Sequence, residues 1–373
     1  KALPAYGTEV VTNVMNSLGN YPTKNFQTGV FPTADKISGE TLKVTYLVGT
    51  KGCWGCTVRC ARLVKIEDPP FQVDYEGAEY EGVWALGGNC GIDDLRAINK
   101  AYAIVNDMGL DVISYGATVA CAMELYEKGK IPEERLHGMK LNFGNAQAIV
   151  DLAWMTGYRT GFGDEIALGA KRLAEKYGMP DVAMHSKGLE LPAYDPRGMQ
   201  GMGLAYATSN RGGCHLRAYT PAVEAFGAPY KVDPYTTQGK AKIVIDQQNW
   251  YAATVDSLVV CKFLTFALGP EDFVDLVRPL TGWDWTVEEL LETGERIYNL
   301  ERLYCAREGV GTKDELPKRL THEPQPEGPA KGHVVKLEEM LEEYYKLRGW
   351  VNGVPTVEKL QQLGLQDYII YLK

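Results

Sequence analysis

Three cysteines within eight residues constrain this chain more than any other feature of its sequence. Cys53, Cys56 and Cys60 form a Cys-x2-Cys-x3-Cys run. Three thiolates so close along the chain converge on one centre only if the loop folds around it, and a metal is the expected centre. Zinc usually takes its ligands as two close pairs, whereas a triplet with a distant fourth cysteine is typical of cubane iron–sulfur clusters. The spacing therefore favours an iron–sulfur cluster, with a zinc site or a purely structural cluster as alternatives.

The fourth ligand must come from elsewhere in the chain, and spacing alone does not choose it. The other five cysteines are Cys90, Cys121, Cys214, Cys261 and Cys305. Isolated cysteines mostly pack as small apolar side chains in the interior, which we expect of Cys121 and Cys305. Eight cysteines in 373 residues are too few for a disulfide scaffold, and no signal-peptide-like run opens the chain. These features predict a cytoplasmic protein.

Composition and charge narrow the class of function. Apolar residues make up 45% of the chain, which is too many for a disordered protein. The net charge of −9 argues against a general nucleic-acid or anionic-membrane surface. No stretch approaches the ~20 uninterrupted apolar residues that a membrane helix needs. Small molecules and protein partners remain as ligands.

Helical periodicity recurs along most of the chain, and convincing strands are few. The segment from residue 12 through the cysteine triplet is turn-rich and predicts a loop with short helical pieces, and residues 189–219, dense in Gly, Pro, Asn and Arg, predict an irregular site-building loop. We expect a mainly α fold in which two helical domains, residues 1–190 and 191–373, enclose a cofactor site. Predicted helices cover residues 93–108, 112–128, 145–157, 165–177, 247–265, 271–280, 286–307 and 337–347.

Several motifs taken together resemble the tungsten-containing aldehyde ferredoxin oxidoreductases. They are the cysteine triplet, the segments 106–111 and 256–261, the run Leu191–Gly198, and the run Tyr206–His215. The resemblance covers essentially the whole chain, but only the second and third, largely helical, domains of the family. The family's N-terminal β-rich domain, on which the paired pterins lie, has no counterpart in this chain. Since the sequence starts at Lys1 within what reads as a domain, we expect the rest of the polypeptide or another chain to supply that domain.

The two segments 106–111 and 256–261 resemble the family's pterin-binding motif, Asp-x-x-Gly-Leu-Asp/Cys, and both depart from it. The first opens with Asn106 in place of Asp. The second has Val259 and Val260 in place of Gly-Leu. The resemblance implies a tungsten bis-pterin cofactor, with magnesium bridging the pterin phosphates, and a [4Fe–4S] cluster.

The resemblance also implies a role for each matching residue. Cys53, Cys56, Cys60 and Cys261 would hold the cluster. Asn106, Leu110, Asp111, Asp256 and Val260 would contact the pterins, and Arg217 would lie near the phosphates. Glu81 would act as the base and His215 as the hydrogen-bond donor. Oxidation of an aldehyde adds an oxygen atom from water and removes two protons, so a proton acceptor and a polarising donor are the groups that this chemistry needs.

The implied function is oxidation of an aldehyde to a carboxylic acid, with electrons passed through the cluster to ferredoxin or to an iron–sulfur partner subunit. The first alternative is a reductase of the same family that acts on an aryl-coenzyme A thioester. The second is a non-catalytic iron–sulfur electron-transfer subunit.

Overall fold

A computed structural model describes residues 2–372 and divides into two compact units. Unit 1 comprises Lys1–Gly198 and Pro317–Val335, and unit 2 comprises Met199–Leu316 and Lys336–Lys373. The mainly α fold is confirmed, since 53% of the protein is helical and the strands form only small sheets. The domain limits 1–190 and 191–373 stay a prediction; the compact units part at Gly198, and unit 1 takes in residues 317–335 as well.

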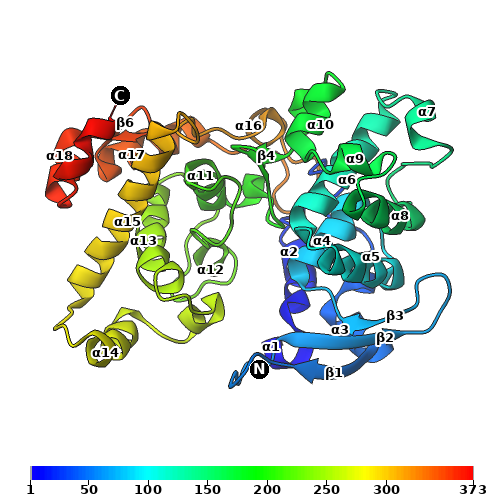
Figure 1. The fold of residues 1–373 in the computed structure, drawn as a ribbon, viewed down its shortest axis with the longest axis horizontal. Coiled ribbons are helices and arrows are strands. Elements are labelled where there is room, and N and C mark those ends of the chain that lie inside the picture. Colours follow the sequence, from blue (N-terminus) through cyan, green and yellow to red (C-terminus); the bar gives the residue numbers. More distant parts are fainter. Residues whose placement is uncertain (1, 373) are drawn as a thin grey trace. The chain divides into compact units, whose positions relative to one another are not determined.

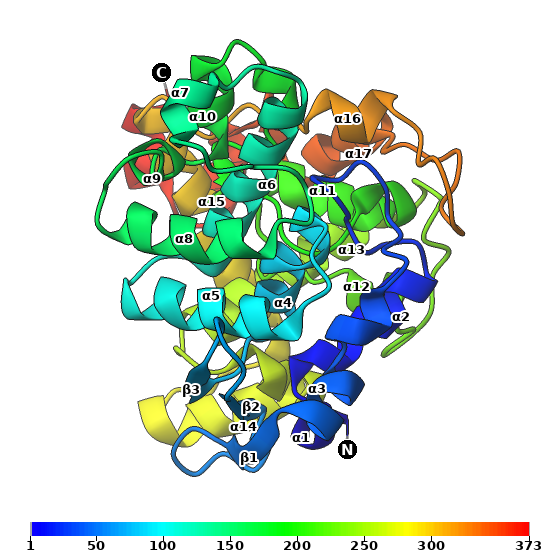
Figure 2. The ribbon, with the colours of Figure 1, turned by 90° about the vertical axis from the view of Figure 1, so that its right-hand side faces the viewer.

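Unit 1 is built around a buried helix, α6 (Val112–Glu127), in which every residue from Tyr115 to Leu125 is buried. Helices α4 (Tyr80–Leu86) and α10 (Ala170–Lys176) pack against it. Figure 2 shows α8 (Ala146–Gly157), α5 (Leu95–Asp107) and a small sheet as successive layers. This packing fixes both ends of the α5–α6 connection.

The small sheet corrects the expectation of a loop with helical pieces before and around the cysteines. Strands β1 (Leu47–Lys51), β2 (Ala61–Ile66) and β3 (Val73–Glu76) form an antiparallel sheet in that order. The cysteine triplet is the connection between β1 and β2. Val64 and Ile66 of β2 are buried whereas Lys65 between them is exposed, a strand alternation that is too short to stand out in the sequence.

Unit 2 is organised around α13 (Lys240–Tyr251), which contacts α11 (Gln200–Thr208), α15 (Val287–Arg307) and α17 (Leu337–Arg348) (Figure 1). The fully buried Arg348 joins two of these helices, because its Nη2 donates to Gln248 Oε1 at 2.7 Å. Its guanidinium also lies 4.5 Å from the ring centroid of Tyr298 on α15. Polar contacts as well as apolar ones therefore stabilise the packing of the helices in unit 2.

Helix ends explain most differences from the predicted helices. The helix predicted at 247–265 is wrong, because α13 ends at Tyr251 and passes through a π-turn, Ala252–Asp256, into a turn and the 3-10 helix Lys262–Phe266. The helix predicted at 165–177 is two short ones, α9 (Gly163–Ile166) and α10, parted by Gly169 with φ +82°.

The other α-helices and strands of unit 1, with its first 3-10 helix, are α1 (Ala2–Tyr6), η1 (Thr8–Val10), α2 (Val11–Ser17), α3 (Gly39–Thr45), α7 (Glu133–Leu136), β4 (His185–Ser186), β5 (Leu189–Glu190) and α16 (Lys318–His322). Those of unit 2 are α12 (Pro221–Glu224), α14 (Pro270–Thr281), β6 (Trp350–Val351), β7 (Val354–Pro355) and α18 (Val357–Gln362). Within residues 2–372, none of the helices has the length and apolar character needed to cross a lipid bilayer.

Candidate cofactor site

The cysteine triplet lies on the β1–β2 connection, with Cys53 exposed and the other two cysteines partly so. The Cys56 N–H donates to Cys53 O at 3.0 Å, and Gly55 between them has φ +70°. The backbone N–H groups of Arg59 and Val58, in that order, lower the pKa of the Cys56 thiol. Backbone donors aimed at a sulfur stabilise a thiolate, the form that binds metals. The chemistry of this loop fits cluster ligation.

Cys261, the predicted fourth ligand, is exposed in unit 2 at the start of the 3-10 helix Lys262–Phe266. Across residues 2–372, no group of three or more His, Cys, Asp or Glu side chains is arranged to hold a metal ion. The four-cysteine ligand set therefore stays a prediction. Cys121 is buried as expected, and burial raises its pKa. The expectation for Cys305 is wrong, because this thiol lines a cavity.

The first predicted pterin motif is the turn between α5 and α6. Gly109 has φ +67°, its N–H donates to Asn106 O at 3.0 Å, and the Leu110 N–H donates to Val105 O at 3.0 Å. Asp111 then caps α6 by accepting from the Ser114 N–H at 2.7 Å. Asn106 and Asp111 are exposed, and Leu110 is half-buried. The turn thus offers polar groups to a ligand while its backbone is held by two helix ends.

Glu81 lies in the first turn of α4, where its Oε2 accepts from the Ala193 N–H at 3.0 Å. Burial raises the pKa of this carboxyl from 4.5 to about 8, the Ala193 hydrogen bond opposes the shift, and the charge of Asp111 adds to it. Unit 1 therefore brings together the predicted base, the first pterin motif and the 191–198 loop. A carboxyl with this pKa takes up and releases protons near neutral pH, as a general base must.

In unit 2, Arg217 joins two acidic side chains. Its Nη1 lies 2.8 Å from Asp256 Oδ2, and its Nη2 pairs with Glu301. Burial lowers the pKa of the Arg217 guanidinium, whereas Glu301, Tyr298 and Asp256 raise it. The second effect is larger, so the pKa lies above its ordinary value. The structure thus unites two sequence-predicted residues, Arg217 and Asp256, and adds Glu301, which no motif in the sequence marked.

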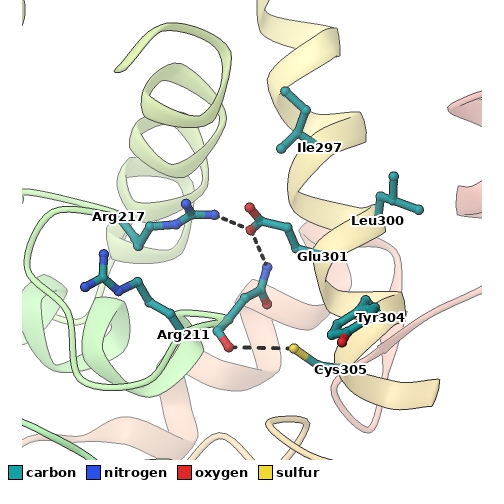
Figure 3. Close-up of a pocket in the computed structure, with 8 residues that line it drawn as sticks. Arg211, Arg217, Ile297, Leu300, Glu301, Tyr304 and Cys305 are labelled. Atoms are coloured by element: carbon teal, nitrogen blue, oxygen red, sulfur yellow. Dashed lines mark hydrogen bonds and ion pairs between the residues drawn. The ribbon is translucent and has the colours of Figure 1, made fainter. Parts of the chain in front are cut away.

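Arg217 and Glu301 border a cavity of about 440 Å³ (Figure 3). Figure 3 shows Arg217 directed toward Glu301 of α15, whose Oε2 also accepts from Asn210 Nδ2 at 3.2 Å. The lining residues are Asn210, Arg211, Arg217, Ile297, Leu300, Glu301, Tyr304 and Cys305. Two arginines beside an apolar wall suit a ligand that has an anionic group and a flat or aliphatic body.

His215 lies two residues before Arg217 and is half-buried. Burial, and then the positive charges of Lys262 and Arg211, lower the pKa of its imidazole from 6.5 to about 3. The ring is therefore neutral at physiological pH, with one nitrogen as a donor and the other as an acceptor. Its centroid lies 6.2 Å from that of Tyr219. A neutral imidazole can still donate the hydrogen bond predicted for it.

The second predicted pterin motif follows the π-turn in unit 2. Val259 has φ +54°, and the Val260 N–H donates to Val255 O at 3.2 Å. The side chain of Val260 packs against a buried cluster that includes Phe273 and Leu290. Asp256 of the same motif is partly exposed, and its carboxylate pairs with Arg217. The backbone conformation of the motif is present although its Gly-Leu pair is not.

Comparison with known proteins gives consistent matches. Residues 1–365 match the family model described as aldehyde ferredoxin oxidoreductase, domains 2 and 3. The chain is 48% identical over 371 residues to the tungsten-containing aldehyde ferredoxin oxidoreductase of Pyrococcus furiosus, and 46% identical over 372 residues to that of Thermococcus kodakarensis. Each match covers 98% of this chain and 61% of the relative, so the chain spans about three-fifths of their length.

More distant matches share the fold. The aliphatic sulfonate oxidoreductase, WOR-like subunit, of Pyrococcus furiosus is 30% identical over 334 residues, which are 84% of this chain and 50% of that protein. A chain of the benzoyl coenzyme A reductase active site complex BamBC, solved with 1,5-dienoyl-CoA, superposes with a TM-score of 0.75 at 17% identity. That superposition covers 97% of this chain and 60% of the other.

Proposed function

Because the chain belongs to the aldehyde ferredoxin oxidoreductase family, as its domains 2 and 3, we propose that it forms part of an enzyme that oxidises an aldehyde to a carboxylic acid. The observation that supports this most strongly is Glu81, a carboxyl with a raised pKa beside the first pterin motif. The relatives at 46–48% identity carry the same activity in their names. The region of these relatives outside the match would complete the site.

The residues of this chain would handle the protons and orient the substrate. Glu81 in its ionised form would take a proton from the water that attacks the aldehyde carbon. The neutral imidazole of His215 would donate a hydrogen bond to the aldehyde oxygen, where negative charge develops. Arg217 would neutralise a phosphate group on the bound ligand.

The chemical types of the predicted site residues suit two prosthetic groups. A tungsten bis-pterin would be held by the predicted contacts Asn106, Leu110, Asp111, Asp256 and Val260, and it would supply the two-electron oxidation. Magnesium would accompany its phosphates, with Arg217 as the basic side chain nearby. A [4Fe–4S] cluster on Cys53, Cys56, Cys60 and Cys261 would pass electrons one at a time to ferredoxin or an iron–sulfur partner subunit. The exposed edges of both turns and the lowered pKa of Cys56 support these assignments.

The test is metal analysis and an aldehyde assay on anaerobically purified native enzyme that contains this chain. We expect about four iron atoms and one tungsten atom per chain, and ferredoxin reduction that depends on added aldehyde. Zinc alone would contradict the redox function. Iron and tungsten without aldehyde-dependent reduction of ferredoxin would contradict the substrate and leave the cofactors.

The two alternatives have weaker support. The reductase of aryl-coenzyme A thioesters shares only the fold with this chain, at 17% identity. A non-catalytic electron-transfer subunit would have no use for a base at Glu81 and a donor at His215. Aldehyde oxidation therefore remains the proposed activity.

A further inference from the structure

Several buried polar side chains in unit 1 have oxygen atoms without a hydrogen-bond partner among residues 2–372, and Glu9, Thr12 and Tyr21 are among them. In these three residues, the atoms are both carboxyl oxygens of Glu9, the hydroxyl of Thr12 and the phenol oxygen of Tyr21. All three side chains have 0% exposure. The Gly88 amide faces the Tyr21 oxygen outside hydrogen-bonding geometry, so the phenol O–H is left to donate elsewhere. Native interiors leave few such groups unpaired, and ordered water or a functional role usually explains them.

Contacts place these groups around the first turn of α4, which contains Glu81. Helix η1, which contains Glu9, packs against α4, and the Tyr80 N–H donates to Thr8 Oγ1 at 2.9 Å. The Tyr21 ring centroid lies 6.2 Å from that of Tyr80. Tyr21 also packs on Gly88, just beyond the other end of α4, where an added Cβ would lie 2.4 Å from the ring. Glu9 and Tyr21 therefore flank the helix that holds the proposed base.

Electrostatics agree with this placement. Burial, then Glu81, then Glu9 raise the pKa of Tyr21, so its phenol is within range of both carboxyls. The charged groups that face Glu9 are Glu79, Arg62 and Glu40. Burial and the two acids raise the pKa of Glu9 well above its ordinary value, against the effect of Arg62. This shift favours the neutral acid, whose O–H can donate while its carbonyl oxygen accepts.

We propose that Glu81, Tyr21 and Glu9 form a proton path that leads from the catalytic base to Glu79, with ordered water bridging oxygen atoms that are not in direct contact. The proposal rests on the proposed function. Glu79 is a suitable exit because it is partly exposed and accepts from the Thr8 hydroxyl beside Glu9. The path makes Glu9 and Tyr21 proton-transfer residues that no motif of the sequence marked.

The proton balance requires such a path. Oxidation of one aldehyde by water releases two electrons and two protons, and the electrons leave by the cluster. When Glu81 gives up a proton, its O–H bond breaks and a new one forms at the Tyr21 oxygen, while the former phenol proton moves to the carbonyl oxygen of Glu9. The Glu9 O–H proton passes in turn to Glu79 and to solvent. Each relay group ends in its starting state, and Glu81 is ionised again.

The first test is Tyr21→Phe in the cofactor-loaded enzyme. The ring keeps its packing on Gly88 and loses only an unpartnered hydroxyl, so the melting temperature should stay the same or rise. We expect kcat and the rate of proton release, followed with a pH indicator in single turnovers, to fall about tenfold or more at unchanged KM. The solvent deuterium isotope effect on kcat should increase. The matched control is Tyr115→Phe, which removes another buried phenol, bonded to Ile149 O at 2.6 Å, and should leave proton release unchanged.

The second test does not depend on activity. Infrared spectra of the resting protein should contain the carbonyl band of a protonated carboxylic acid that disappears in Glu9→Gln. An unchanged spectrum would mean that Glu9 is ionised, which would overturn the proposal. If the wild type oxidises aldehydes and Tyr21→Phe releases protons at the same rate, the path is wrong and the proposed function stands. If the wild type oxidises no aldehyde, the proposed function fails first and the path loses its purpose, whatever the protonation of Glu9.

Discussion

The turns at 106–111 and 256–261 have similar backbones and different side-chain chemistry. In each, the chain leaves a helical segment through a residue with positive φ, Gly109 or Val259. In each, the next N–H donates back to the carbonyl five residues earlier, Leu110 to Val105 and Val260 to Val255. A hydrogen bond of this kind is a common way to close a helix C-terminus. The conformation therefore survives the loss of the glycine that usually allows it.

The charges beside the two turns act differently. Asp111 caps α6 and raises the pKa of Glu81. Asp256 pairs with Arg217, which Glu301 also holds. The carboxylate of the first turn thus raises the pKa of a neighbouring acid, whereas that of the second turn belongs to an ion-pair network. The same backbone turn therefore lies beside an acid with a raised pKa in one setting and beside a paired arginine in the other.

The largest effect should come from the acid beside the first turn. Glu81→Gln keeps the shape of the side chain and removes the base, so we expect aldehyde oxidation to fall about 100-fold or more. The melting temperature should not fall, because Gln buries no charge. The exposed Glu127→Gln is the control. If Glu81→Gln keeps the kcat of the wild type, Glu81 is not the base, and the functional distinction between the two turns is lost.

The next effect tests the backbone of the first turn. Gly109 has φ +67°, and an added Cβ would meet nothing within 4 Å, so a substitution there is opposed by backbone conformation alone. We expect Gly109→Val to lower the free energy of unfolding by about 1–2 kcal/mol. Gly109→Asn should cost less, because Asn tolerates this conformation. Urea denaturation measures both, and equal stability of all three proteins would show that the turn relaxes.

The electrostatic difference predicts a change in pH dependence. The pKa of Glu81 rises from 4.5 to about 8, so the folded protein holds a proton that the unfolded chain loses at lower pH. The free energy of unfolding should therefore fall as pH rises through this range, while kcat rises toward pH 8. Asp111→Asn preserves the cap, since both residues cap well, and removes the charge. Both profiles should then move to lower pH, by about one unit or less.

Asp256→Asn is the matched variant in the second turn. It removes the Arg217 partner and leaves Glu301 in place, so the pH profile of kcat should stay where it is in the wild type. The free energy of unfolding should fall by about 1 kcal/mol or less, because Asp256 is partly exposed. A pH shift as large as that of Asp111→Asn would show that the two carboxylates are not distinct in their action.

The sequence predicted helices well where periodicity and capping agree, and its assignment of the site residues stays a prediction. Amphipathic spacing located α5, α8 and α15 to within about two residues, because each presents one apolar face and begins at a capping side chain. It failed at α13, where the apolar run from Ala252 to Val260 is a π-turn and a loop that packs on Phe273. Glu9, Tyr21 and Glu301 were missed because each depends on a neighbour distant in the sequence, Glu79, Glu81 and Arg217 respectively, and no local pattern contains such a pair.

The smallest expected effect is a gain in the free energy of unfolding when Val259 in the second turn is replaced by glycine. Val259 is 89% exposed, so Val259→Gly removes almost no buried surface, and it relieves a β-branched residue with φ +54°. Glycine makes the unfolded chain more flexible, which offsets part of that gain, and we expect a net stabilisation of about 0.5–1 kcal/mol. The control is Val44→Gly, because Val44 is 82% exposed within helix α3 and has no strain to lose. That change should destabilise by up to about 1 kcal/mol. If the free energy of unfolding rises in Val259→Gly and falls in Val44→Gly, the second turn has a conformation that favours glycine although it contains none. If it falls equally in both variants, Val259 contributes more through packing than its exposure suggests.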